Sequence, residues 1–293
     1  MKILSNINTF IKNNFLNNLK KRTYTTKQIA FVSDIHLEHK HWNKKYPRFN
    51  NNQLEQTSNI SGVAILGDIG NIYHSNYLNF ISYCALNYNN VYFLTGNHEH
   101  YIKGMFNQNL NQKINDRVNI VIDHAITKSN NNNIYYLNNN MLKINDKFLI
   151  GSTFWSNQSL SIKNENPYNS FYKYINKEHD IACNFIKDTT KLIEKYNNAY
   201  NINYNNITIM THYPPTSLAI QYPYSNLIKS DYAKSLRYFS HNDKLIKYPI
   251  KNWLCGHSHS VYDIYANGVY VGLNCYNHPS KIGSEIKLKI IDL

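Results

Sequence analysis

The stretch VYFLTGNHE, residues 91–99, joins four apolar residues to a polar turn that contains glycine, asparagine, histidine and glutamate. Two earlier stretches have the same form, since residues 29–32 lead into a turn with Asp34 and residues 63–66 lead into a turn with Asp68. Short apolar runs that end at turn residues are typical of strands buried on both faces. The sequence therefore predicts a sheet whose strands end in polar, potentially reactive turns.

The remaining chain continues this alternation of apolar segments and polar turns. Residues 207–210 lead into Thr211-His212, and residues 252–255 lead into Gly256-His257-Ser258-His259. Strand, turn, helix and strand in this order indicate a layered α/β domain. The spacing of apolar residues predicts helices at residues 73–88 and 178–197, and strands at 134–137, 142–144, 148–150, 261–265, 269–273 and 286–291. The stretch rich in Tyr, Asn and Lys at residues 155–177 is expected to be an insertion, and Asn267-Gly268 a hairpin turn.

The polar turns carry a set of oxygen and nitrogen donors. Open α/β sheets place their sites beyond the carboxyl ends of strands, so we expect all five turns to meet at one edge. In extended backbone, residues two apart point the same way, which would direct Asp34 with His36, and His257 with His259, into one pocket. Carboxylate, imidazole and amide donors without a thiolate suit Mn, Fe or Zn. Glycines at positions 67, 96 and 256 indicate tight turns or close backbone approach.

Taken in order, the turns read Asp-x-His, Gly-Asp, Gly-Asn-His-Glu, His and Gly-His-x-His. This series resembles the calcineurin-like metallophosphoesterase superfamily over residues 29–276, and most closely its small stand-alone phosphoesterases. The likeness includes the GSTFW stretch at residues 151–155 and the HYPP stretch at residues 212–215. The resemblance implies an α/β fold of the αββα type, a four-layer sandwich of two mixed sheets flanked by helices.

The resemblance also implies a dinuclear centre that binds two divalent metal ions, Mn²⁺, Fe²⁺/Fe³⁺ or Zn²⁺. Hydroxide bridging the two ions would attack a phosphomonoester or phosphodiester of a small molecule or nucleotide. His98 would face the leaving group as a catalytic residue. The implied ligands are Asp34, His36, Asp68 and His259 for one ion, and Asp68, Asn97, His212 and His257 for the other, with Asp68 bridging.

Other interpretations stay open beside this one. A nuclease or cyclic-nucleotide phosphodiesterase would suit the basic, Tyr-rich loop at residues 216–248, and the same fold can serve as a non-catalytic binding scaffold. Nucleic acid has only weak support as a partner, because arginine is scarce and no known nucleic-acid-binding module is present. Glu99 either orients His98 or raises the pKa of His98, or it caps the helix that follows.

Charge and composition divide the chain into a leader and a body. The net charge of the 293 residues is +13, and six of the positive charges lie in residues 1–33, which contain no carboxylate before Asp34. Residues 1–27, basic and with apolar residues at helical spacing, fit either a mitochondrial transit peptide or a disordered extension of a cytoplasmic protein. Residues 28–293 are expected to form the catalytic domain. Four separated cysteines exclude a disulfide scaffold, and no apolar run is long enough for a membrane helix.

Overall fold

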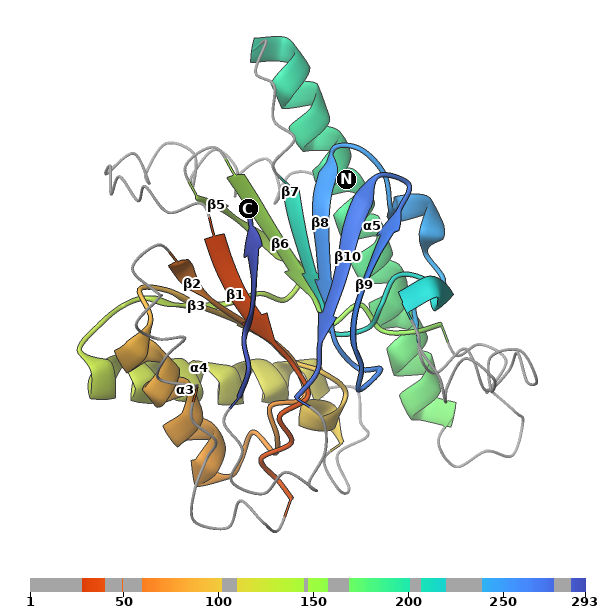
Figure 1. Cartoon of the computed structure of the whole chain (residues 1–293). Coiled ribbons are helices and arrows are strands. Elements are labelled where there is room, and N and C mark those ends of the chain that lie inside the picture. The colour runs from red at the N-terminus through yellow and green to blue at the C-terminus, as the bar shows by residue number, and fades with distance from the viewer. Residues whose placement is uncertain are drawn as a thin grey trace.

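Two mixed sheets face each other at the centre of the protein (Figure 1). The computed structural model describes residues 28–39, 49, 60–101, 110–144, 147–157, 169–200, 207–219, 239–276 and 286–293. The expected leader, residues 1–27, and most of the basic loop, residues 220–238, lie outside these described residues.

The first sheet has the strand order β11-β1-β2-β3-β4. The four strands β1 to β4 run parallel, and β11 pairs antiparallel with β1. The strands span Gln28–Val32 (β1), Ile60–Leu66 (β2), Val91–Leu94 (β3), Ile134–Tyr136 (β4) and Lys289–Asp292 (β11).

The second sheet has the order β5-β6-β7-β8-β10-β9, with β5 and β9 antiparallel to their neighbours and the other pairs parallel. Its β9–β10 hairpin turns at Asn267-Gly268, where both residues have positive φ, as expected. The strands span Asn140–Ile144 (β5), Lys147–Ser152 (β6), Ile207–Thr211 (β7), Ile250–Cys255 (β8), Val261–Ala266 (β9) and Val269–Asn274 (β10).

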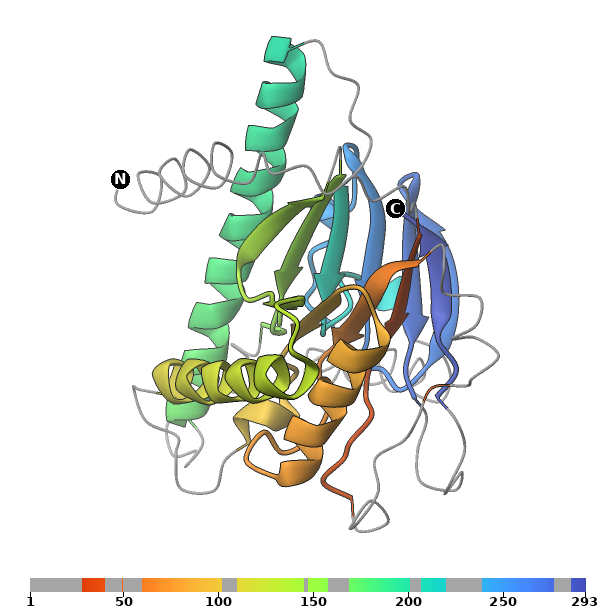
Figure 2. The same cartoon turned by 90° about the vertical axis from the view of Figure 1, so that its left-hand side faces the viewer.

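Helices cover the outer faces of both sheets. Helices α3 and α4 lie against the first sheet, and the long helix α5 lies against the second (Figure 2). In the described part of the chain, no helix is long and apolar enough to cross a membrane. Among the described residues, the helices span Ser75–Asn87 (α3), Leu110–Ser129 (α4) and Asn169–Tyr200 (α5), and short 3-10 helices span His98–His100 (η3), Ser217–Ala219 (η5) and Asp243–Leu245 (η6).

Alternating side chains of β1 show how the layers pack. Ala30 and Val32 join the core under α3 and α4, whereas Ile29 and Phe31 point into the core between the sheets. Leu149 of β6 faces them from the second sheet. A third core packs α5 onto the outer face of the second sheet. Three apolar interfaces separate four layers, which confirms the αββα sandwich.

The helices differ in part from the sequence prediction. Helix α5 begins at Asn169, within the expected insertion, and its buried Phe171 and Ile175 continue the same apolar stripe as Ala182 and Ile186. The first turns of α5 contain so many Asn, Lys and Tyr residues that the apolar stripe is difficult to recognise in the sequence. Helix α4 was not predicted, although its buried residues also have helical spacing. Strand β11 begins at Lys289 instead of residue 286.

Candidate active site

The five polar turns meet at one end of the sandwich. Three follow the carboxyl ends of β1, β2 and β3 in the first sheet, and two follow β7 and β8 in the second. Backbone hydrogen bonds hold neighbouring turns together: the Asp34 amide donates to Gly67 O (3.1 Å), His36 to Asp68 O (2.9 Å), and Gly256 to His212 O (2.9 Å). The turns meet beyond the carboxyl ends of strands, as the sequence predicts, but the strands belong to two sheets and not to one.

The backbone at the site is left-handed instead of extended. Five of the seven predicted ligands have positive φ, namely Asp34 (56°), His36 (53°), Asp68 (50°), His257 (66°) and His259 (50°). The expectation that extended backbone directs Asp34 with His36, and His257 with His259, is therefore wrong, although their side chains do reach a common site. Left-handed conformations are uncommon for residues with a side chain and cluster at functional sites.

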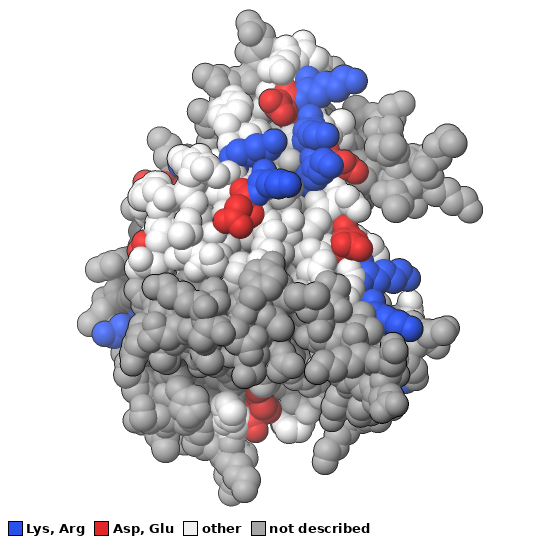
Figure 3. All heavy atoms as spheres, turned by 90° about the vertical axis from the view of Figure 1, so that its right-hand side faces the viewer, with Lys and Arg blue, Asp and Glu red and all other residues white. Residues whose placement is uncertain are grey.

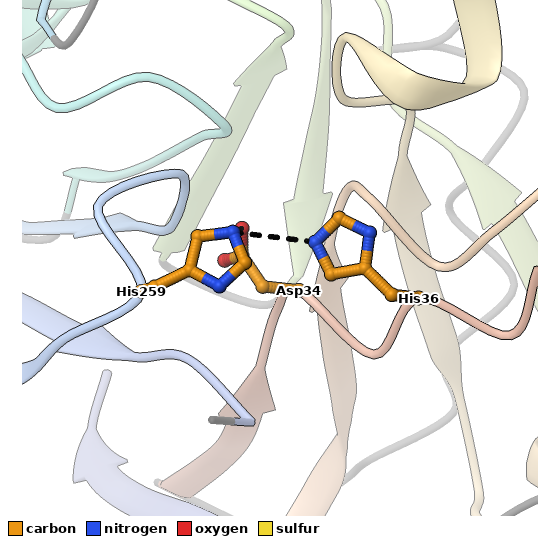
Figure 4. A group of neighbouring side chains, drawn as sticks. All are labelled: Asp34, His36 and His259. Carbon is orange, nitrogen blue, oxygen red and sulfur yellow. Dashed lines mark hydrogen bonds and ion pairs between the residues drawn. The ribbon is translucent and has the colours of Figure 1, made fainter. Parts of the chain in front are cut away.

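One donor group consists of Asp34, His36 and His259 (Figure 4). His36 Nε2 lies 3.3 Å from His259 Nε2, which lies 3.6 Å from Asp34 Oδ1. The other oxygen, Asp34 Oδ2, accepts hydrogen bonds from Ser33 Oγ (2.5 Å) and the His257 amide (2.9 Å). Asp34 Oδ1 is buried with no hydrogen-bond partner among the described residues. A buried carboxylate oxygen without a partner is costly, and a cation beside it would compensate this cost.

A second donor group consists of Asp68, His212 and His257, with Asn97 beside it. His212 Nε2 lies 3.3 Å from Asp68 Oδ2, 3.0 Å from Asn97 Oδ1 and 3.2 Å from His257 Nδ1. The opposite ring nitrogen, His212 Nδ1, lies 2.8 Å from the carbonyl oxygen of Leu66, to which it donates. That hydrogen bond leaves His212 Nε2 to face the other donors.

The Asp68 carboxylate lies between the two groups. Its Oδ2 atom is 3.8 Å from His36 Nε2 on one side and 3.3 Å from His212 Nε2 on the other. Its Oδ1 atom accepts a hydrogen bond from the His98 amide (2.9 Å), which fixes the plane of the carboxylate. Asp68 is thus close to a histidine of each donor group.

His98 occupies the open side of the site. Its side chain is 39% exposed, whereas the Asp68 and His212 side chains are almost fully buried. Its Nε2 atom lies 4.0 Å from Asp68 Oδ2. A solvent-accessible imidazole beside buried donors can reach a substrate without being a member of either donor group.

Charge interactions hold protons on two of the histidines. Burial by itself would lower the pKa of His36, but the hydrogen bond to Glu38 and the carboxylates of Asp68 and Asp34 raise it to about 9. Burial also opposes protonation of His212, and Asp68 and Asp34 raise its pKa to about 9. Burial tends to raise the pKa of Asp68, yet His212 holds it well below its usual range. The site thus concentrates negative charge that protons or metal ions can balance.

Glu99 contacts the backbone instead of His98. Its carboxylate accepts hydrogen bonds from the amides of Gly96 (2.7 Å), Asp68 (3.1 Å), Ile69 (2.7 Å) and Gly70 (3.3 Å). The hydrogen bonds of Glu99 among the described residues therefore do not match either function that the sequence suggested. They join the turn after β2 to the turn after β3.

The three glycines of the turns leave room for these contacts. A Cβ atom on Gly96 would lie 2.1 Å from Asp68 Oδ1, and one on Gly256 would lie 2.4 Å from Ser33 Oγ. Gly67 combines a φ of +83° with a Cβ position 2.8 Å from His212 Nδ1. The close approach that the sequence suggested is thus a requirement of the site.

Sequence reasoning did not single out Glu38. This carboxylate lies between His36 and His98 and contacts an imidazole nitrogen of each. Its position two residues after His36 is the only sequence signal, and it becomes informative only when the turns after β1 and β3 are placed side by side.

The donor set fits divalent metal ions. Carboxylate oxygen and imidazole nitrogen atoms lie within 4.8 Å of one another in each group. Asp34 Oδ1, which is buried and accepts no hydrogen bond among the described residues, gives a further reason for a cation. No thiolate belongs to either group, so the site suits Mn, Fe or Zn. Such a site at the strand ends of a four-layer sandwich defines the class of metal-dependent phosphoesterases.

The chain belongs to the calcineurin-like phosphoesterase family, whose sequence profile matches residues 27–261, and it is a hydrolase of phosphate esters. The uncharacterized protein L509 of Acanthamoeba polyphaga mimivirus is 27% identical over 266 residues, which cover 84% of this chain and 89% of that protein. The crystal structure of phosphopantetheinyl hydrolase from Mycobacterium tuberculosis matches with a TM-score of 0.52 at 11% identity, covering 90% of this chain and 95% of that one. At this identity the likeness concerns the fold.

Proposed function

We propose that the chain hydrolyses phosphomonoesters or phosphodiesters of small molecules or nucleotides at a centre of two divalent cations. Asp34, His36 and His259 would hold one ion, Asn97, His212 and His257 would hold the other, and Asp68 would contact both. The observation that carries this proposal is the position of Asp68 Oδ2 between the imidazoles of His36 and His212.

When bound there, the two ions would polarise the phosphoryl group and activate water as the nucleophile at neutral pH. His98, exposed beside Asp68, would give a proton to the oxygen of the leaving group. General acid catalysis of this kind contributes about 10²–10⁴-fold in rate. Asp34 and Asp68 stay ionised because nearby histidines keep the pKa of each carboxyl low against the opposing effect of burial.

The test is hydrolysis of p-nitrophenyl phosphate and bis(p-nitrophenyl) phosphate by protein loaded with Mn²⁺. Asp68→Asn should lose this activity because the amide has no charge to share between two ions, while its shape preserves the fold. Asp188→Asn, on the exposed face of α5, is the matched control and should retain the activity. Unchanged turnover in Asp68→Asn would refute the proposal.

The charges on the exposed face of α5 do not favour nucleic acid as the substrate. Exposed lysines on α5 (Lys173, Lys177, Lys187, Lys191 and Lys195) share their helix with exposed Asp180, Asp188 and Glu194. Figure 3 shows Lys and Arg side chains gathered on the upper part of this face with Asp and Glu side chains among them. Mixed charge does not form the continuous basic track that a nucleic-acid backbone needs. Labelled DNA and RNA and cyclic nucleotides, tested beside small phosphate esters, would identify the substrate class.

A further inference from the structure

Glu38 makes the same contact with two histidines of different expected function. Its Oε1 atom lies 2.9 Å from His36 Nδ1 and 3.0 Å from His98 Nδ1. The two rings meet edge to face, with centroids 4.5 Å apart. One carboxylate oxygen therefore contacts both an expected metal ligand and the expected proton donor.

The contact with Glu38 fixes the position of one proton in each histidine ring. An ionised carboxylate only accepts hydrogen bonds, so each Nδ1 atom must carry the proton that it donates. In neutral His36 this leaves the lone pair on Nε2 for a metal ion, whereas in His98 a second proton, on Nε2, would be the one given to the leaving group. The Nε2 atoms of His36 and His98 lie 3.8 Å and 4.0 Å from Asp68 Oδ2, on the side where the reaction is expected.

The turn after β2 makes room for the Glu38 side chain. A Cβ atom on Gly70 would lie 2.9 Å from Leu37 Cβ and 3.0 Å from Glu38 Oε2, so only glycine leaves this space free. The Leu37 amide donates to Ile69 O (2.8 Å), which fixes the backbone beside Glu38. The carboxylate is therefore held by its surroundings instead of extending into solvent.

We propose that Glu38 is a positioning residue that orients His36 toward metal and His98 toward the leaving group at the same time. The inference rests on the proposed function, because it assigns the two histidines those two tasks. His212 is oriented by its hydrogen bond to the backbone carbonyl of Leu66, which a mutation cannot remove. The orientation of His36 and of His98 depends instead on the side chain of Glu38. A change at Glu38 should consequently produce two separate defects.

The first defect concerns metal binding. Removal of a carboxylate that supports a metal-ligating histidine typically lowers metal affinity by about 10–100-fold. Glu38→Ala should show a loss of this size in a titration of the metal-free protein with Mn²⁺, and Glu38→Gln, which keeps an acceptor oxygen without the charge, should show a smaller loss. Glu194→Gln, an exposed change on α5, should bind Mn²⁺ like the wild type.

The second defect concerns the leaving group. At saturating Mn²⁺, an alkyl phosphate with a poor leaving group needs the proton from His98, whereas p-nitrophenyl phosphate hardly does. Glu38→Ala should therefore lower kcat for the alkyl ester much more than kcat for the p-nitrophenyl ester, with little change in KM. His98→Ala should show this second defect alone, and His36→Ala should show the loss of metal.

The two measurements together decide the inference. Both defects in Glu38→Ala, with a melting temperature close to that of the wild type, would support it. Wild-type Mn²⁺ affinity or an unchanged ratio of the two kcat values in folded Glu38→Ala would overturn it. If the wild type cleaves neither ester, the proposed function fails, and the Mn²⁺ titration still tests whether Glu38 orients His36.

Discussion

Replacement of Gly96 by alanine should inactivate the site through a single methyl group. The new Cβ atom would lie 2.1 Å from Asp68 Oδ1 and 2.6 Å from the Asp68 amide nitrogen, whereas ordinary contacts begin at 3.4 Å. The Asp68 carboxylate must then retreat by about 1 Å, and a misplacement of that size costs about 10²-fold in rate. Because φ of Gly96 is not in the left-handed region, contact and not backbone strain causes the loss.

The assay compares kcat for p-nitrophenyl phosphate and the bound Mn²⁺ of Gly96→Ala with those of Gly268→Ala. Gly268, in the β9–β10 hairpin turn, has a φ of +79° and no atom within 4 Å of its Cβ position. Its replacement should cost about 1–2 kcal/mol of stability through backbone strain but leave activity intact. Wild-type activity and metal content in Gly96→Ala would show that Asp68 tolerates displacement and would refute the reasoning.

Three further predictions concern stability and pH. Glu99→Ala would leave buried amides without an acceptor, at about 1–3 kcal/mol each, so urea unfolding should show a loss of about 3 kcal/mol or more. Leu149→Ala, in the core between the sheets, should lower the free energy of unfolding by about 2–5 kcal/mol in the same assay. The pKa values of His36 and His212 are both raised to about 9, so protonation of the two rings stabilises the folded, metal-free protein. This stabilisation is complete below pH 6.5 and is lost as the pH rises through 9. The urea midpoint of the metal-free protein should therefore fall as the pH rises over this range. Calorimetry should show that Mn²⁺ affinity rises over the same range, because the metal has fewer protons to displace. A flat pH response would contradict both expectations.

The order of strands and polar turns could be predicted from the sequence because it depends on local patterns. Apolar runs such as residues 91–94 identify buried strands, and the polar residues that follow must lie at the strand ends. The resemblance supplied the two-sheet arrangement, which no local pattern in the chain contains. Leu110, Ile114 and Val118 of α4 carry a helical stripe, but polar residues and the exposed Ile120 interrupt the pattern, so the helix escaped prediction.

The exact geometry of the candidate site could not be predicted in the same way. Left-handed backbone at Asp34 and His36 arises from hydrogen bonds to the turn after β2, a segment some thirty residues away. The contacts of Glu38 and Glu99 likewise join turns that follow different strands. Such interactions depend on tertiary structure, and a single sequence offers no periodicity that would reveal them.

The origin of the donors in both sheets has a consequence for the lifetime of the protein. Asp34 and Asp68 follow strands of the first sheet, while His212 and His257 follow strands of the second. A cation bound by both would link the halves of the sandwich and favour the folded chain by mass action, by about 2.7 kcal/mol when free metal is 100 times its dissociation constant. Metal starvation would then expose the chain to proteolysis as well as remove its activity, so the amount of this protein in a cell should follow the supply of metal.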